Sequence, residues 1–222
     1  MSLILNIETA TKNCSVALAR DGQTVSSQEI SGQGYSHAEK LHVFIETVLK
    51  DSSVSYADLD AIAVSRGPGS YTGLRIGVSA AKGLCFALGI PMIAVDTLQV
   101  LASQANVSDG VVIPMLDARR MEVYSAIFSA SGAQLRETKA EVVTEESFAE
   151  ISQKAYFVGD ANEKCEPVLK RNNFAFLNDI VFPSALAMSS LSFAKFNNNE
   201  FEDVAYFEPF YLKDFLAAPP KK

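Results

Sequence analysis

The sequence predicts an α/β protein made of two related halves, each with a mixed β-sheet and helices packed on it. Short apolar runs typical of buried strands alternate with helical runs along the 222 residues. A strand–turn–strand pattern opens the chain and recurs near its middle. Hydrophobic residues make up 48% of the chain, which is enough for two cores of about a hundred residues each.

The first half is predicted to be a three-stranded meander followed by alternating helices and strands. Its predicted strands are residues 3–7, 15–20, 24–30, 59–65 and 92–95. Ser36 and Glu39 have the spacing of a capping box, so the first helix is predicted to run from there to about residue 50. The second predicted helix covers residues 74–88, which are almost entirely apolar.

The second half repeats the opening of the first. In each half an apolar strand ends at a carboxylate, a short polar turn follows, and a second strand runs to a glycine. Glu8 and Gly22 mark this pattern in the first half, and Asp117 and Gly132 mark it in the second. The predicted elements of the second half are strands over 111–116, 122–128 and 156–158, a helix over 187–197 and a disordered tail over 217–222. We therefore predict two domains, residues 1–97 and 98–222.

Charge and cysteine content exclude several classes of function. The formal net charge of -7 argues against autonomous binding of nucleic acid, so a role on RNA would need a basic partner. The three cysteines are far apart and form no Cys-x-x-Cys pair, which indicates a reducing cytoplasm. No basic stretch precedes Glu8 and no apolar run has the length of a membrane span, so neither a signal peptide nor membrane attachment is expected.

A glycine-rich segment, residues 66–77, joins the fourth predicted strand to the long helix. It has neither the lysine of a P-loop nor the third glycine of a dinucleotide-binding turn. Two interpretations stay open: a tight turn with close helix packing, or direct anion binding at the start of the helix. Gly73, Gly77 and Ala81 fall four residues apart, a stripe that would let another helix approach closely.

The long helix also predicts a protein interface. Arg75 and Lys82 are its only charged residues, so it must be covered on more than one face. The chain's own sheet can cover one face, and we expect a partner to cover the other. The first helix has an apolar stripe that equally suits an ordinary sheet-covering helix. The predicted partner-contacting residues are Ala38, Leu41, His42, Ile45, Gly73, Leu74, Gly77, Val78 and Ala81. A charge at Val78 is accordingly expected to abolish pairing while the monomer stays folded.

Several segments resemble the bacterial TsaB (YeaZ) family, and the similarity covers nearly the whole chain. The segments that carry it are residues 7–11, 14–18, 35–39, 66–77, 89–91, 117–119 and 209–212. The glycine-rich segment is the most specific of them. The resemblance implies the actin-like ATPase, hexokinase and Hsp70 (ASKHA) fold, with two duplicated α/β domains and a cleft between them.

The resemblance also implies a function, namely a part in making threonylcarbamoyladenosine (t6A) in tRNA. In that family the TsaB subunit is non-catalytic and pairs with its paralogue TsaD, which carries the metal and transfers the threonylcarbamoyl group. TsaE, an ATPase, joins the pair. We therefore expect a heterodimer with a TsaD-like protein, contact with tRNA only through the complex, and a homodimer when the chain is alone.

The residues present agree with a non-catalytic role. His37 and His42 are five apart, so on a helix their rings point about 140° apart and no metal site is expected. Glu8, Thr9 and Asp117 are the candidate nucleotide-binding residues, but their turns lack the glycine that lets a phosphate approach. No cofactor is expected to be required, although a weak or shared ATP/ADP-Mg site at the partner boundary stays open. The alternatives are an ASKHA-fold small-molecule kinase, a protease-like protein and a structural homodimer.

Overall fold

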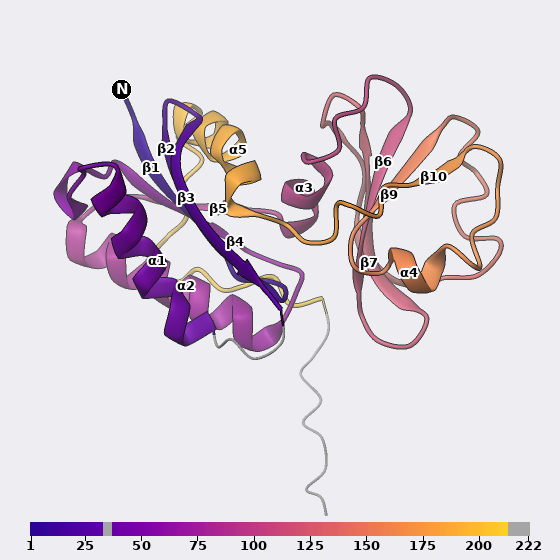
Figure 1. Cartoon of the computed structure of the whole chain (residues 1–222), viewed down its shortest axis with the longest axis horizontal. Helices are drawn as coiled ribbons and strands as arrows, with labels where there is room; N and C mark the ends of the chain where they lie inside the picture. The colour runs from indigo at the N-terminus through magenta and orange to yellow at the C-terminus, as the bar shows by residue number, and fades with distance from the viewer. Residues whose placement is uncertain (33–36, 213–222) are drawn as a thin grey trace, which may run out of the picture.

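The computed structural model describes residues 1–32 and 37–212, which form two sheets with helices packed against them (Figure 1). The first sheet contains β1 (Leu3–Glu8), β2 (Asn13–Arg20), β3 (Gln23–Ser31), β4 (Ala61–Ser65) and β5 (Met92–Val95). The second contains β6 (Val111–Asp117), β7 (Glu122–Ser129), β8 (Gln134–Val142), β9 (Ala155–Val158) and β10 (Phe174–Phe176). The α-helices are α1 (His37–Asp51), α2 (Tyr71–Leu88), α3 (Thr97–Ala102), α4 (Asn162–Cys165) and α5 (Ala185–Asn197).

The two sheets have the same topology, which confirms the predicted duplication. Their strand orders are β3-β2-β1-β4-β5 and β8-β7-β6-β9-β10. The central strand of each, β1 or β6, pairs antiparallel with the strand that follows it and parallel with a strand further along the chain. Because β1 and β6 are equivalent, the carboxylates that end them, Glu8 and Asp117, occupy equivalent positions.

Helices cover both faces of the first sheet. Helices α1 and α2 lie side by side on one face, and α5 lies on the other (Figure 1). Leu41 and Ile45 of α1 and Val78 of α2 belong to the core on the first face. Ala185 and Met188 of α5 pack with β1, β2, β4 and β5 on the second face.

The position of α5 corrects the predicted domain boundary. Residues 98–222 were expected to form the second domain, but α5 returns to the first sheet and contacts β1, β2 and β5. The meander leaves one face of that sheet uncovered, and α5 buries its apolar residues there. Helical periodicity predicts that a face must be buried, but not against which sheet, so the boundary could not be read from the pattern.

Several element boundaries differ from the sequence prediction. Helix α2 begins at Tyr71 rather than at residue 74, because Ser70 caps it: the Ser70 Oγ accepts a hydrogen bond from the Gly73 N–H at 3.2 Å. Strand β8 was not predicted, since charged residues alternate along this edge strand and leave no apolar run. The predicted Ser36 cap and the predicted disordered tail over 217–222 lie outside the described residues.

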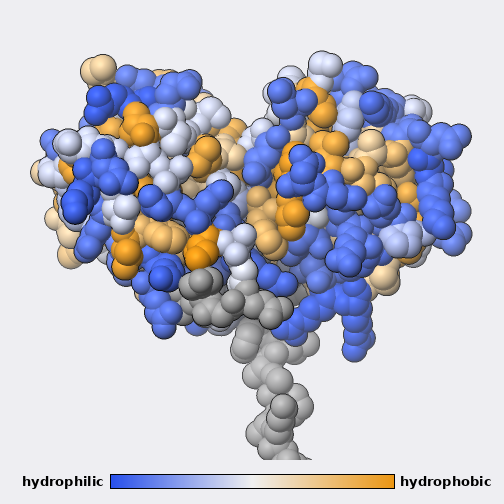
Figure 2. Space-filling model, viewed as in Figure 1, coloured by the Kyte–Doolittle hydropathy of each residue, from blue (hydrophilic) through white to orange (hydrophobic). Residues whose placement is uncertain are grey.

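Hydrophobic residues do not merge into one continuous area on the face shown in Figure 2. They lie in separate groups among hydrophilic residues on both halves of the molecule. Within residues 1–32 and 37–212, no helix is long and apolar enough to cross a bilayer.

The glycine stripe of α2 packs against the chain's own β1–β2 turn. A Cβ atom at Gly73 would lie 2.1 Å from the Thr9 carbonyl oxygen, and one at Gly77 would lie 2.3 Å from the Thr9 Oγ1. Gly69, just before the helix, approaches the Ala10 carbonyl oxygen in the same way, with a Cβ distance of 2.3 Å. The expectation that the stripe admits a partner's helix is therefore wrong, because Gly73 and Gly77 lie against Thr9 of the chain's own turn.

Two glycines of α2 offer a matched test of this packing. Gly73→Ala should lower the free energy of unfolding by about 1–3 kcal/mol, because the new methyl group overlaps a backbone oxygen that cannot move alone. Gly83→Ala should raise it by about 0.5–1 kcal/mol, because this exposed position has no atom within 4 Å of an added Cβ and alanine favours the helix. Urea unfolding of both variants checks this, and shifts of the same sign would contradict the packing.

Candidate functional site

A cleft of about 740 Å³ lies between the two halves. The segments that line it are the β1–β2 turn (residues 10–11), the glycine-rich segment (68–72), the β6–β7 turn (116–120) and the C-terminal segment (210–212). Glu122, Tyr124 and Asp160 complete the lining. The two duplicated turns thus face one cleft, as the predicted architecture requires.

Glu8 lies beneath this cleft and does not line it. Its side chain is fully buried, its Oε1 accepts a hydrogen bond from the Ala10 N–H at 2.6 Å, and its Oε2 has no partner among the described residues. Burial raises the pKa of Glu8 to about 7, although the Ala10 N–H partly opposes the rise. A carboxyl group in this position is largely neutral at slightly acidic pH.

Thr9 is buried as well. Its Oγ1 donates a hydrogen bond to the Gly73 carbonyl oxygen at 2.8 Å, so the side chain fastens the turn to α2. Helix α2 and the glycine-rich segment close over Glu8 and Thr9 and leave only Ala10 and Thr11 at the cleft. The two predicted nucleotide-binding residues of the first turn are therefore shielded from the cleft.

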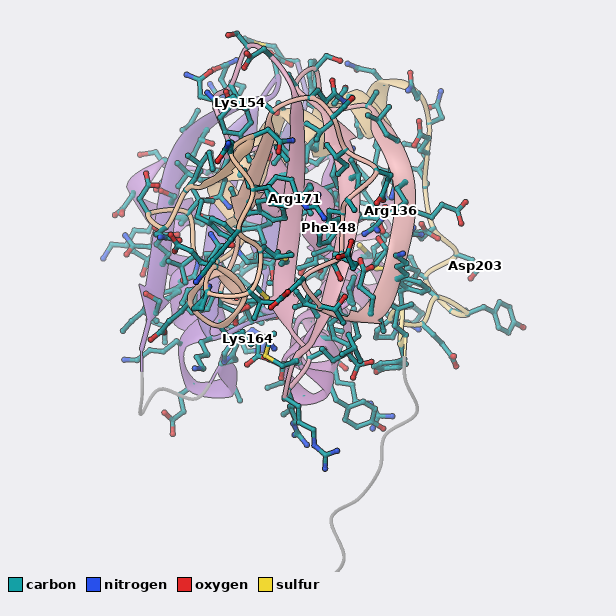
Figure 3. All side chains as sticks on the ribbon, turned by 90° about the vertical axis from the view of Figure 1, so that its right-hand side faces the viewer. Arg136, Phe148, Lys154, Lys164, Arg171 and Asp203 are labelled. Atoms are coloured by element: carbon teal, nitrogen blue, oxygen red, sulfur yellow. The ribbon has the colours of Figure 1, made fainter. Side chains whose placement is uncertain are left out.

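Asp117, the third predicted residue, is exposed but already engaged. Its Oδ1 accepts a hydrogen bond from the Arg119 N–H at 2.8 Å and forms an ion pair with the Lys164 ammonium group. Lys164, labelled in Figure 3, also donates to the carbonyl oxygens of Arg120 and Glu122 at 2.8 and 2.7 Å, so it holds the whole turn. Partial burial would raise the pKa of Asp117, but Lys164 and the Arg119 N–H hold it below its usual value.

Asp160, which lies between β9 and α4, also bonds to the β6–β7 turn. Its Oδ1 accepts a hydrogen bond from the Asp117 N–H at 2.8 Å. Burial, together with the nearby negative charge of Asp117, raises the pKa of Asp160. The carboxylates of Asp117 and Asp160 are thus both bonded to other groups of the protein.

These residues do not fit a magnesium nucleotide bound at the two turns. Magnesium is usually held by one or two carboxylates together with the substrate phosphates, and the backbone must approach those phosphates closely. Glu8 is buried, and the Asp117 carboxylate is already paired with the Lys164 ammonium group. Arg119 and Arg120 stand in the second turn where glycine would give the closest approach.

Neither histidine lies in a metal-binding group. The His37 Nε2 lies 2.8 Å from the Thr11 carbonyl oxygen, and His42 is exposed on α1. Within the two described ranges, no three or more His, Cys, Asp and Glu side chains are placed to hold a metal ion.

The cysteines are unsuited to nucleophilic catalysis. Cys14, Cys85 and Cys165 are all buried and free. Burial raises the pKa of each thiol to about 11. Because the thiolate is the reactive form, none of the three is an activated nucleophile at neutral pH.

Most of the predicted partner-contacting residues lie in the chain's own core. The buried members are Leu41, Ile45, Gly73, Leu74, Gly77, Val78 and Ala81. Ala38 and His42 alone are exposed. The expectation that a charge at Val78 leaves the monomer folded is wrong, because that side chain is only 4% exposed and the charge would enter the core.

The outward faces of the same helices present other residues. On α2, Ser79, Gly83 and Phe86 point away from the sheet, and the Phe86 side chain is 86% exposed. On α1, Val43 is 53% exposed beside His42. Phe86 and Val43 were not among the predicted partner-contacting residues. On α2, the four-residue spacing of small residues indicated a close approach but not which element makes it.

The C-terminal segment, residues 210–212, packs against the start of α2. The Tyr211 ring lies 5.1 Å from the Tyr71 ring, and the Tyr211 hydroxyl group accepts a hydrogen bond from the Arg75 Nε at 3.3 Å. One residue earlier, the Phe210 N–H donates to the Arg66 carbonyl oxygen at 2.7 Å. The segment therefore ties the glycine-rich turn to the first turn of α2 and forms one wall of the cleft.

Comparisons with known proteins agree with this geometry. The family model described as TsaD, tRNA N6-adenosine threonylcarbamoyltransferase, matches residues 29–217. The tRNA threonylcarbamoyladenosine biosynthesis protein TsaB of Escherichia coli K12 is 32% identical over 224 residues, which cover 96% of each chain.

Solved structures give the same result. YeaZ from Pseudomonas aeruginosa superposes with a TM-score of 0.80 at 29% identity, covering 96% of this chain and 100% of that chain. The ethanolamine utilization protein EutJ from Carboxydothermus hydrogenoformans shares the fold, with a TM-score of 0.51 at 12% identity over 85% of this chain and 89% of that chain. The predicted fold class and the resemblance stated from the sequence are confirmed.

The raised pKa of Glu8 predicts a specific pH dependence of stability. Between its unfolded value of 4.5 and about 7, the folded chain binds more protons at this group than the unfolded chain. The free energy of unfolding should therefore fall as pH rises through this window, by about 3 kcal/mol from this group alone.

Glu8→Gln tests this dependence, because glutamine keeps the acceptor for the Ala10 N–H and cannot ionise. We expect the variant to lack the fall between pH 5 and pH 8 and to be more stable than the wild type at pH 8. Urea unfolding at both values measures it. An equal fall in the two proteins would contradict the assignment.

Proposed function

Because the chain belongs to the TsaB family of tRNA threonylcarbamoyladenosine biosynthesis proteins, we propose that it is a non-catalytic subunit of the assembly that modifies tRNA. A role in t6A biosynthesis follows from its similarity to TsaB proteins along nearly its whole length. The finer proposal is that the chain pairs with a TsaD-like paralogue, which performs the threonylcarbamoyl transfer.

The state of the duplicated turns supports a non-catalytic role. Glu8 is buried, Asp117 is paired with Lys164, and the three thiols are buried with raised pKa values. The same observations disfavour a small-molecule kinase of this fold, because its nucleotide would need free carboxylates at these turns. We propose that the chain requires no cofactor of its own, and that any ATP or ADP is shared with the partner at their boundary.

The single observation that carries the pairing proposal is the exposed Phe86 on the outward face of α2. The Phe86 ring is 86% exposed, and a partner that covers it would remove this large apolar area from water. Val43 of the neighbouring α1 is a second exposed apolar side chain on this pair of helices. Two helices from each paralogue would then form a four-helix contact. A second copy of the chain could use the same face, which would give a homodimer in the absence of the paralogue.

The remaining members of the assembly follow from the family. We propose that TsaE joins the heterodimer and that tRNA is contacted through the complex rather than by this acidic chain alone. The place of action is then the cytoplasm, where the tRNA that the assembly modifies is found.

Phe86→Asp should weaken binding of the TsaD-like paralogue by about thirtyfold or more, because it puts an unpaired charge in an apolar contact. Leu135→Asp is the matched control, since Leu135 is 58% exposed on β8 of the other sheet. Light scattering of mixtures measures the complex, and an assay with TsaE, tRNA and threonylcarbamoyl-adenylate measures its activity.

Circular dichroism of both variants should match that of the wild type, since neither side chain is in the core. Wild-type affinity of Phe86→Asp, or equal weakening by Leu135→Asp, would contradict the proposed interface. Tight binding on which modification does not depend would contradict the proposed role.

A further inference from the structure

Two arginines, Arg119 and Arg120, line the cleft and have no part in the proposed function. We infer that the cleft binds a small molecule carrying a phosphate or pyrophosphate group, held by the guanidinium groups of Arg119 and Arg120 without a magnesium ion. This inference concerns the isolated chain, and it stands or falls independently of the pairing with a paralogue.

The first support is the backbone at these two arginines. Both have positive φ angles, 73° for Arg119 and 50° for Arg120, in the turn between β6 and β7. Non-glycine residues rarely adopt positive φ, and two of them in succession strain the backbone of this turn. Arginines therefore occupy two positions for which the fold itself favours other residues.

The second support is the state of their side chains. Both arginines are exposed and line the cleft. Within the described part of the chain, neither guanidinium group has an ion-pair or hydrogen-bond partner. By contrast, the Arg66 and Arg136 side chains are paired with carboxylates.

The carboxylates of the cleft do not compete for these arginines. Asp117 is paired with Lys164, and Asp160 accepts the Asp117 N–H. Glu122 has an interaction of its own. Lys12, from the first turn, adds a positive charge that acts on both Asp117 and Asp160. Arg119, Arg120 and Lys12 therefore place positive charge at the cleft, although the chain as a whole carries -7.

This arrangement selects the class of ligand. Guanidinium groups bind phosphate through paired, charge-assisted hydrogen bonds. The cleft volume of about 740 Å³ is that of a small-molecule site. The net negative charge of the chain disfavours a long RNA backbone, so a small phosphate compound is the better match. Since the nearby carboxylates are engaged or buried, this binding needs no bridging metal ion.

Calorimetric titration of the full chain with tripolyphosphate tests the inference, with and without Mg²⁺. We expect binding in the absence of Mg²⁺. Arg119→Asn/Arg120→Gly should weaken it by about tenfold or more, because it removes both guanidinium groups. The same variant should have a higher Tm than the wild type, because asparagine and glycine adopt positive φ more readily than arginine does.

Arg20→Ala is the matched control, since it removes an exposed arginine at the far end of β2. It should bind tripolyphosphate like the wild type. If the double variant fails to fold, the single variants Arg119→Ala and Arg120→Ala replace it, and each should weaken binding.

Four results would overturn the inference. They are absence of binding by the wild type, binding that requires Mg²⁺, weakening by Arg20→Ala equal to that of the double variant, and unchanged binding by folded variants of the pair. A further arm uses tRNA: if the isolated chain binds tRNA through Arg119 and Arg120 more tightly than tripolyphosphate, the site is an RNA surface rather than a small-molecule site.

Discussion

The close approach of α2 to the β1–β2 turn is the contact on which the rest of the structure depends. It requires glycine at positions 73 and 77, because a Cβ atom at either would overlap Thr9. The same contact buries Glu8 and Thr9 and sets the rotation of α2 about its axis. With its glycine side turned inward, the helix presents Phe86 to solvent. One packing constraint thus shields the first turn from the cleft and creates the surface that we propose for a partner.

The carboxyl groups of the two duplicated turns are kept from binding a ligand in different ways. In the first, burial raises the pKa of Glu8, and α2 covers the group. In the second, Lys164 neutralises Asp117, and Arg119 and Arg120 bring further positive charge. A cleft lies between the two halves, as in other proteins of this fold, but the residues at both turns do not suit a magnesium nucleotide. A chain of this kind can contribute to tRNA modification through its surfaces, which agrees with its membership of the TsaB family.

Much of the fold could be predicted from the sequence, because its main determinants are local. Strand β1, helix α2 and the repeat of Glu8 at Asp117 follow from apolar runs, glycine positions and spacing. The sheet against which α5 packs could not be predicted, since helical periodicity does not identify the sheet that a helix covers. Most of the predicted partner-contacting residues proved to be buried, for a related reason. A stripe of small residues indicates that another element approaches closely, but it does not identify that element. Here it is the turn at Thr9, sixty-four positions from Gly73. The Lys164–Asp117 pair joins residues on separate elements, so spacing alone gave no indication of it.

The most direct test of the central claim is hydrogen–deuterium exchange at the amides of residues 8–11, measured with and without MgATP. If α2 closes this turn, the Ala10 amide, which is bonded to Glu8, should exchange as slowly as the amides of β1. MgATP should leave that protection unchanged. Rapid exchange at residues 9 and 10 in the free chain, or a change in their protection that depends on MgATP, would show an open turn and contradict the account.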